Sequence, residues 1–281
     1  MYEYMRSGAL CVAAVLLTVS IFGGCTSGGH PSSQMGEETD SSIQISAGIS
    51  EGTTTTTAAQ TTYTSPRTSP SVAAVDPGEL ISCRLTVPYI SQEGVLPTGC
   101  EMVSAAMLLQ YYGYDITAQT LVNEYLDAEP LETRDGQLYG PHPRDAFVGD
   151  PWSSSGFGCY APVVVRMLNK LPDRQHEAVD LSGLPLSQLI REYVSKGHPV
   201  LVWVTIAWLE VSDGPSWIDT RTGETYVWQN QEHCMVLTGA DETGYYLNDP
   251  YKSNGRIRVN RSRVEDRYAS MGGQAVAFLP R

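Results

Sequence analysis

The amino-acid sequence predicts an α+β domain in which a helical part precedes an antiparallel sheet. Residues 100–126 carry apolar side chains at helical spacing, whereas the chain from residue 233 onward consists of short β-rich segments separated by turns. Helices grouped before strands are typical of the α+β class. The 281 residues, 42% of them hydrophobic, leave room for one sizeable domain and some additional chain.

The first 24 residues predict a signal peptide, with a basic residue at Arg6 ahead of an apolar run at residues 9–22. An apolar run of about 14 residues is shorter than the roughly 20 that a membrane-spanning helix needs. The run ends in Phe22-Gly23-Gly24-Cys25, which resembles the bacterial lipoprotein signal, in which a peptidase cuts before the cysteine and that cysteine is lipidated. We therefore expect lipidation at Cys25 and an extracytoplasmic protein anchored to the bacterial cell membrane. An ordinary secretory signal, which would leave the protein free, is the alternative.

Residues 25–76 predict a disordered tether. The segment is rich in Ser, Thr, Pro and Gly and has few residues that could form a core. Such a composition cannot bury enough apolar surface to offset the entropy of an ordered chain. Residues 77–281 are thus expected to form the folded domain.

The chain is acidic, with a net charge of −13. The tether has five acidic residues against one arginine, so the folded part carries about −9. This balance argues against a nucleic-acid partner, which requires a basic surface.

The first half of the folded domain is expected to be mainly helical. Residues 80–90 alternate apolar and polar side chains and predict a strand. Residues 100–112 are apolar on nearly every side, which predicts a buried helix that Gly113 closes. Further helices are expected at residues 117–126, 161–171 and 185–196. Residues 129–158, long and rich in Gly, Pro, Asp and Ser, predict a functional loop that forms one rim of a cleft.

The second half is expected to be mainly β-structure. Residues 199–206 are nearly all apolar and β-branched, which predicts a buried central strand. Residues 207–231 contain three tryptophans and two turn signals, and predict an inserted hairpin or lid. Strands are then expected at residues 233–239, 245–248, 256–259 and 274–279, with a helix at residues 262–271.

Cys100 stands at the predicted start of the buried helix. Thr98 and Glu101 have the three-residue spacing of a capping box, so Thr98 is expected to cap the helix and Glu101 to reach back. The unpaired amides and the positive end of the helix dipole would favour the thiolate there, which makes the sulfur a nucleophile. The alternative is that Cys100 is an inert buried residue, as free cysteines often are.

A predicted hairpin brings a histidine and an aspartate together. If the turn centres within residues 240–243, His233 lies opposite residue 249, 250 or 251, and Asp249 falls in that window. Cross-strand side chains are about 5 Å apart, near enough for a carboxylate to orient an imidazole. We expect Asp249 to hold one ring nitrogen of His233 while Nε2 points outward. A structural histidine and an ordinary Asn-Asp-Pro turn are the alternatives.

These residues supply every role of thiolate catalysis. His233 takes the proton of Cys100 and later gives it to the leaving group, while Asp249 orients the imidazole. The Cys100 backbone amide and the Gln92 side-chain amide are the candidate donors to an oxyanion.

The order and spacing of the motifs resemble one known family. Val87-Pro88-Tyr89-Ile90-Ser91-Gln92, Thr98-Gly99-Cys100-Glu101, HCMVLTG at 233–239 and Asn248-Asp249-Pro250 look like the bacteriocin-processing (double-glycine) peptidase-like group of papain-like cysteine peptidases, over roughly residues 83–280. FVGDP at 147–151 and GFGCYAP at 156–162 look like its stand-alone envelope lipoprotein branch. The resemblance implies a papain-like fold, in which a nucleophile at the start of a buried helix packs on a C-terminal antiparallel sheet.

The resemblance also implies a thioester acyl-enzyme, with Cys100 as nucleophile, His233 as general base and acid, Asp249 as orienting residue and Gln92 as oxyanion donor. It does not extend to the substrate, because cleavage after a double glycine belongs to peptidase domains fused to exporters, and the sequence shows no Walker-type phosphate loop. We expect a monomer without cofactor that hydrolyses a peptide or protein, cell-wall peptide included. Acyl or glutamine transfer and a catalytically silent peptide- or wall-binding module are the alternatives.

The other cysteines and histidines have weaker claims. Cys159 also precedes a helix but lacks an acidic capping partner, and strand alternation points Cys234 to the face opposite His233. Cys83, Cys159 and Cys234 could supply a disulfide, in a pairing that the sequence leaves open. His142 and His198 lack metal-ligand spacing, so no metal is expected. The aromatic residues of the segment 207–231 either line a groove for an extended peptide or glycan or pack in the core.

Overall fold

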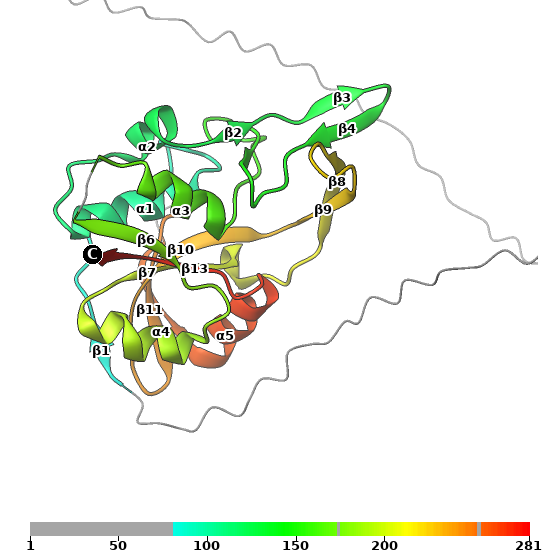
Figure 1. Ribbon diagram of the computed structural model, residues 1–281. Helices are drawn as coiled ribbons and strands as arrows, with labels where there is room; N and C mark the ends of the chain where they lie inside the picture. Colours follow the sequence, from blue (N-terminus) through cyan, green and yellow to red (C-terminus); the bar gives the residue numbers. More distant parts are fainter. Residues whose placement is uncertain (1–80, 173–174, 252–253) are drawn as a thin grey trace, which may run out of the picture. The chain divides into compact units, whose positions relative to one another are not determined.

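The computed structural model describes residues 81–172, 175–251 and 254–281 (Figure 1). The predicted signal peptide, the lipidation site at Cys25 and the tether at residues 25–76 lie outside the described residues and stay predictions. The predicted start of the folded domain at residue 77 lies outside them as well. Within the described ranges, no helix has both the length and the apolar character that crossing a bilayer would require.

The helices and strands follow one another along the described chain as predicted in outline. The helices are α1 (Cys100–Tyr111), α2 (Ala118–Glu124), α3 (Ala161–Asn169), α4 (Leu186–Glu192) and α5 (Arg261–Ser270), with 3₁₀ turns η1 (Val194–Lys196) and η2 (Ile206–Trp208). The strands are β1 (Cys83–Arg84), β2 (Ala128–Glu129), β3 (Glu132–Arg134), β4 (Gln137–Gly140), β5 (Phe147–Val148), β6 (His176–Asp180), β7 (Val200–Thr205), β8 (Asp213–Asp219), β9 (Thr225–Gln229), β10 (Glu232–Ala240), β11 (Gly244–Asp249), β12 (Gly255–Asn260) and β13 (Ala275–Pro280).

An antiparallel sheet with helices on both faces forms the centre of the domain. Its strands lie in the order β12-β11-β10-β7-β13-β6, and β1 also pairs with β10. The helices α1 and α3 cover one face, and α4 and α5 cover the other (Figure 1). Alternate residues of the central strands face the two layers: Trp203 and Cys234 pack in the core with α1 and α3, and Val202 and Met235 in the core with α4 and α5. The predicted α+β class is confirmed.

The helix α1 is buried on almost every side, as its apolar sequence predicts. Every residue from 102 to 109 is fully buried. The helix ends at Tyr111, and Gly113 follows with a φ of +87°, a conformation that favours glycine. A helix surrounded in this way holds its first residue, Cys100, at a fixed place against the sheet.

The strand predicted at residues 80–90 is limited to β1. Beyond β1, individual hydrogen bonds hold the chain in place. The Leu85 amide donates to the Thr238 carbonyl, and the Asn248 side chain donates to the carbonyls of Val87 and Pro88. The edge strand β6 was not predicted at all. Its sequence, His-Glu-Ala-Val-Asp, is short and mostly polar and therefore carries little periodic signal.

The predicted loop at residues 129–158 contains paired strands. The strands β3 and β4 form a hairpin whose turn places Asp135 and Gly136 at φ values of 50° and 78°. Because β4 pairs with β8 and β8 pairs with β9, this segment joins the hairpin predicted in residues 207–231 to make one four-stranded sheet. Strands of two to four residues are too short to be recognised from alternation.

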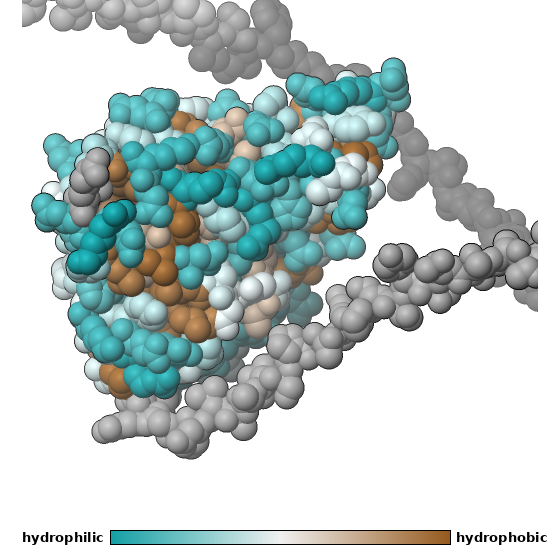
Figure 2. Space-filling model, in the orientation of Figure 1, coloured by the Kyte–Doolittle hydropathy of each residue, from teal (hydrophilic) through white to brown (hydrophobic). Residues whose placement is uncertain are grey.

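The surface drawn in Figure 2 is mostly hydrophilic, with hydrophobic residues in separate patches. Among the described residues, Leu209 at 51% and Trp152 at 44% are large hydrophobic side chains with high exposure. Exposed apolar residues scattered in this way are ordinary on a protein surface and do not by themselves indicate a docking face.

Candidate active site

Cys100 is the first residue of α1, as predicted, but the predicted capping box does not form. Gly99 occupies the N-cap position, and no side chain bonds to the helix start. The Thr98 hydroxyl instead donates to backbone oxygens of the segment 150–153, and the Glu101 carboxylate accepts a bond from a backbone amide outside α1. Thr98 and Glu101 therefore form hydrogen bonds with distant parts of the chain rather than with the start of α1.

His233 and Asp249 meet across the hairpin of β10 and β11. The register pairs Val236 with Asn248, so His233 and Asp249 are diagonal neighbours on one face of the sheet. His233 Nε2 lies 2.7 Å from Asp249 Oδ1, and both side chains are almost fully buried. The predicted pair is present, but the predicted ring orientation is wrong. Nε2 faces the carboxylate, which leaves Nδ1 as the nitrogen that can face the sulfur.

Asp249 is held in its charged form by several donors. Besides His233, the Tyr251 amide and the Asn254 side chain donate to its carboxylate. Burial raises the pKa of Asp249, but these hydrogen bonds outweigh burial and leave the pKa below its ordinary value. A carboxylate fixed in this way can orient the imidazole and stabilise an imidazolium.

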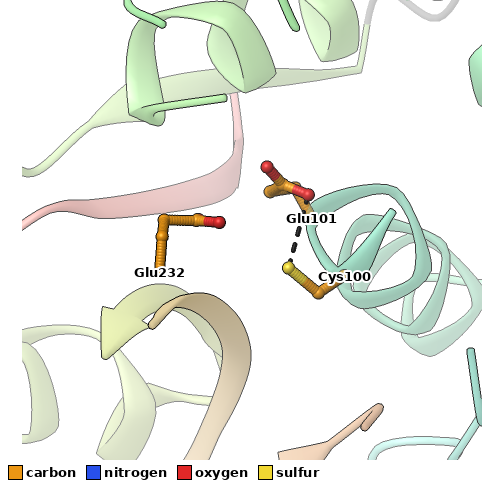
Figure 3. A group of neighbouring side chains, drawn as sticks. All are labelled: Cys100, Glu101 and Glu232. Atoms are coloured by element: carbon orange, nitrogen blue, oxygen red, sulfur yellow. Dashed lines mark hydrogen bonds between the residues drawn. The ribbon is translucent and has the colours of Figure 1, made fainter. Parts of the chain in front are cut away.

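The Cys100 sulfur contacts the backbone of β10 at Cys234, the residue that follows His233. The backbone N–H of Cys234 donates to Cys100 Sγ at 3.4 Å. One turn along α1, the Ser104 hydroxyl donates to the Cys234 carbonyl at 3.0 Å, so helix and strand are bonded at two points. Within the described chain no hydrogen bond joins Cys100 to His233. The thiol donates instead to Glu101 Oε2 at 3.4 Å (Figure 3).

The surroundings of Cys100 favour the protonated sulfur. Burial raises the pKa of the Cys100 thiol well above its ordinary value, and the charges of Glu101 and Glu232 raise it further, whereas the bond from the Cys234 amide lowers it. The predicted thiolate at the helix start is therefore wrong for this state of the site. A helix terminus carries only about half an elementary charge, which dehydration and two neighbouring carboxylates outweigh. Chemistry at this sulfur requires a base that takes the proton during the reaction.

Two glutamates to which the sequence pattern gave no chemical role complete the site. Glu101 is fully buried, and the Cys159 amide donates to its Oε1. Glu232, the first residue of β10, extends toward Cys100 and Glu101 (Figure 3). The two carboxylates converge on Gly158, where an added Cβ would lie 2.7 Å from Glu232 Oε2 and 2.9 Å from Glu101 Oε1. Their places beside Cys100 and His233 in the sequence are the only signal that could have drawn attention to them.

Burial also changes the acidity of this glutamate pair. It raises the pKa of Glu101 from the ordinary 4.5 to about 7, although donated hydrogen bonds oppose the change. Burial and the charge of Glu101 together raise the pKa of Glu232 well above its ordinary value. At neutral pH the pair therefore retains at least part of its protons.

Known proteins are similar in sequence to this chain. The profile of the Peptidase_C39 like family matches residues 84–276. The chain belongs to this family. One relative is the uncharacterized protein YvpB of Bacillus subtilis (strain 168). The two chains are 35% identical over 183 residues, which are 65% of this chain and 70% of YvpB.

A solved structure shares the fold of this C39-like chain, and a second is reported for comparison. A Bacillus anthracis protein named as a C39-like peptidase is 30% identical, with a TM-score of 0.62 over 72% of this chain and 98% of that one. The peptidase domain of Streptococcus ComA is 15% identical, with a TM-score of 0.43 over 70% of this chain and 100% of that one. The predicted resemblance and the predicted papain-like α+β fold are confirmed, and the family indicates a cysteine peptidase.

Gln92 lies between the two parts of the site in this C39-like peptidase domain. Its backbone N–H donates to the carbonyl of Pro250, next to Asp249, and its Nε2 donates to the carbonyl of Pro97, ahead of Cys100. Its Oε1 is buried and has no hydrogen-bond partner in the described ranges. Gln92 thus stays near the start of α1 without a bond to the sulfur, and its part as oxyanion donor stays a prediction.

The other described cysteines are thiols. Cys83, Cys159 and Cys234 are free, so none of the disulfides that the sequence left open forms among them. Cys234 is fully buried and packs in the core with α1, on the layer that also contains Cys100. Cys159 is also buried there, and burial raises the pKa of its thiol well above the ordinary value, as it does for Cys100.

A pocket of about 530 Å³ adjoins Glu232. It is lined by residues 154–157 on one side and by Ile206, Pro215, Trp228 and residues 230–232 on the other. Residues 154–157 belong to the predicted cleft rim, and Trp228 belongs to the aromatic segment predicted to line a groove or to fill the core. Glu232 therefore belongs both to the wall of this pocket and to the surroundings of Cys100.

Proposed function

We propose that this chain is an extracytoplasmic cysteine peptidase or related amide hydrolase that acts through Cys100, His233 and Asp249. The observation that carries the proposal is the bond from the Cys234 backbone N–H to Cys100 Sγ. This bond holds the sulfur at the residue that directly follows His233, whose imidazole is paired with Asp249. Membership in a C39-like family supports the same chemistry.

In the proposed first step, His233 Nδ1 takes the thiol proton while Cys100 Sγ attacks the carbonyl carbon of the scissile amide. Nδ1 has this part because Nε2 is engaged by Asp249. The Cys100 side chain must first leave its bond to Glu101, which a rotation about χ1 achieves. The Asp249 carboxylate then stabilises the imidazolium.

The tetrahedral intermediate carries an oxyanion that needs donors. The backbone N–H of Cys100 lies at the free end of α1, and the Gln92 side-chain amide can exchange its bond with Pro97 for one with the oxyanion. The imidazolium protonates the leaving amine, the C–N bond breaks, and a thioester remains on Cys100. Water, deprotonated by His233, then attacks the thioester and releases the acid and the thiol.

A probe of the thiol tests this proposal. The full chain is treated with a thiol-directed peptide electrophile and with a peptide library, and products are read by mass spectrometry. Cys100→Ala and His233→Ala should lose both labelling and cleavage with little change in melting temperature, whereas Cys83→Ala should keep both. Equal labelling of wild type and Cys100→Ala would refute the assignment.

The proposed location rests on Phe22-Gly23-Gly24-Cys25 and on the composition of residues 25–76. A lipidated Cys25 and a flexible tether would let the domain reach peptides and proteins of the envelope, cell-wall peptide included. Mass spectrometry should find an acylated Cys25 in the membrane fraction, and Cys25→Ala should shift the protein out of that fraction. An unmodified Cys25 inside an intact leader contradicts this part of the proposal.

A second candidate is a catalytically silent peptide-binding module on the same fold. The bond of the Cys100 thiol to Glu101, and the raised pKa of that thiol, favour it. Peptides that bind wild type and Cys100→Ala equally well, with no turnover by either, would decide for this module.

A further inference from the structure

Cys100, Glu101 and Glu232 place three metal-ligating atoms around one point. One sulfur and one carboxylate oxygen from each glutamate all lie within 4.8 Å of one another, and all are buried. The separation of Cys100 Sγ and Glu101 Oε2 is 3.4 Å. Neighbouring ligands of a tetrahedral zinc ion are about 3.5 Å apart, given bonds of about 2.3 Å to sulfur and 2.0 Å to oxygen. The cluster therefore needs only a small movement of Glu232 to match.

Glu232 supplies a separate observation that points to a ligand. Its Oε1 is shielded from solvent and has no hydrogen-bond partner among the described residues. In Figure 3 its carboxylate is directed toward Cys100 and Glu101. A buried carboxylate oxygen is normally satisfied by a donor or a cation, so Glu232 Oε1 is available to bind one.

None of the ion pairs among the described residues involves Glu101 or Glu232. A divalent cation can bind both carboxylates and the thiolate, and any protons that these groups carry then pass to solvent.

We propose that Cys100, Glu101 and Glu232 bind one divalent cation of the zinc class through a thiolate and two carboxylates. The sulfur ligand selects zinc over magnesium or calcium, which prefer oxygen ligands alone. Three protein ligands leave the fourth tetrahedral position to water. Because the bound sulfur cannot attack a carbonyl, the cation reversibly silences the nucleophile, a consequence that rests on the proposed peptidase function. Ligand-spacing motifs give no sign of this site, since its donors come from α1 and β10.

Direct metal binding tests the proposal. The reduced full chain, freed of metal with a chelator, is titrated with Zn²⁺ by calorimetry and with Cd²⁺ by the ultraviolet absorption of cadmium–thiolate bonds. The wild type should bind one Zn²⁺ tightly and show the cadmium band, and Cys100→Ala should lose both. Glu232→Gln should weaken Zn²⁺ binding by more than about tenfold, since losing even an outer partner of a ligand costs this much. Glu242→Gln, which removes an exposed carboxylate, should bind as the wild type does.

Two further measurements keep the outcome decisive. Melting curves of the metal-free variants identify any variant that fails to fold, and for such a variant Glu232→Asp, which keeps a carboxylate, should restore part of the affinity. Zn²⁺ should protect Cys100 from iodoacetamide in the wild type and not in Glu232→Gln. A cadmium band that persists in Cys100→Ala, or Zn²⁺ affinity unchanged in folded Glu232→Gln, overturns the site. Labelling by the peptide electrophile is measured without metal, so it tests the peptidase proposal separately.

Discussion

Replacing Glu101 by Gln should make Cys100 more reactive. The Glu101 carboxylate accepts the thiol bond at 3.4 Å and is a main acidic neighbour that raises the pKa of Cys100. Glutamine keeps an oxygen that can accept the bond from the Cys159 amide, so the connection between α1 and the segment before α3 is retained. The substitution therefore removes the negative charge next to the sulfur and little else.

The size of the effect follows from the distance. Two unit charges 3.4 Å apart interact by about 5 kcal/mol at an effective dielectric constant of about 20. At about 1.4 kcal/mol per pH unit, this corresponds to a change of about 3.5 in the pKa of Cys100. The full effect is not reached near neutral pH, because burial raises the pKa of Glu101 to about 7 and leaves it partly protonated. We therefore expect the pKa of Cys100 to fall by about one to three pH units.

The assay is the rate of iodoacetamide alkylation as a function of pH, with the modified peptide resolved by mass spectrometry so that Cys100 is distinguished from the other thiols. The midpoint of the profile should move to lower pH in Glu101→Gln, and Glu242→Gln should leave it in place. A Glu101→Gln variant that alkylates more slowly than the wild type at neutral pH refutes the reasoning. The carboxylate would then activate the sulfur rather than restrain it.

Three further predictions follow from the same contacts. Asp249→Ala should reduce labelling by the peptide electrophile more than about a hundredfold, because the imidazole loses the group that orients it. Asp249→Asn, which keeps a hydrogen bond to Nε2, should retain more labelling than Asp249→Ala, and an equal loss in both variants would show that only the charge matters. Gly158→Ala should lower the free energy of unfolding in urea by about 1–3 kcal/mol, because the new Cβ would lie 2.7 Å from Glu232 Oε2 and 2.9 Å from Glu101 Oε1. An unchanged free energy of unfolding would mean that both glutamate side chains move away freely. Folding raises the pKa of Glu101 from 4.5 to about 7. Protonated Glu101 therefore contributes about 3 kcal/mol to stability below pH 4.5, and this contribution is lost as the pH rises through 7. Relative to Glu101→Gln, the wild type should therefore lose about this much stability between pH 4.5 and pH 8, and a difference that is constant with pH would contradict the assigned cause.

Residue patterns alone predicted the framework of the site. Eight consecutive fully buried positions in α1 follow from an apolar run, and the start of that helix at Cys100 was predicted correctly. The pairing of His233 with Asp249 followed from the position of the hairpin turn, because strand register is fixed once the turn is known. The capping box failed because Thr98 and Glu101 had better partners elsewhere in the fold.

Sequence by itself determined which residues lie on buried helices and paired strands, because periodicity records the division between core and solvent. Tertiary structure alone decided the chemistry of the sulfur. Only the packing of α1 on β10 brings Glu232 to Cys100 and removes the water that would have favoured a thiolate. Only the folded hairpin of β10 and β11 turns Nε2 of His233 toward Asp249. These outcomes depend on distances between groups far apart in the chain, and electrostatic energies in a dry site change steeply with such distances.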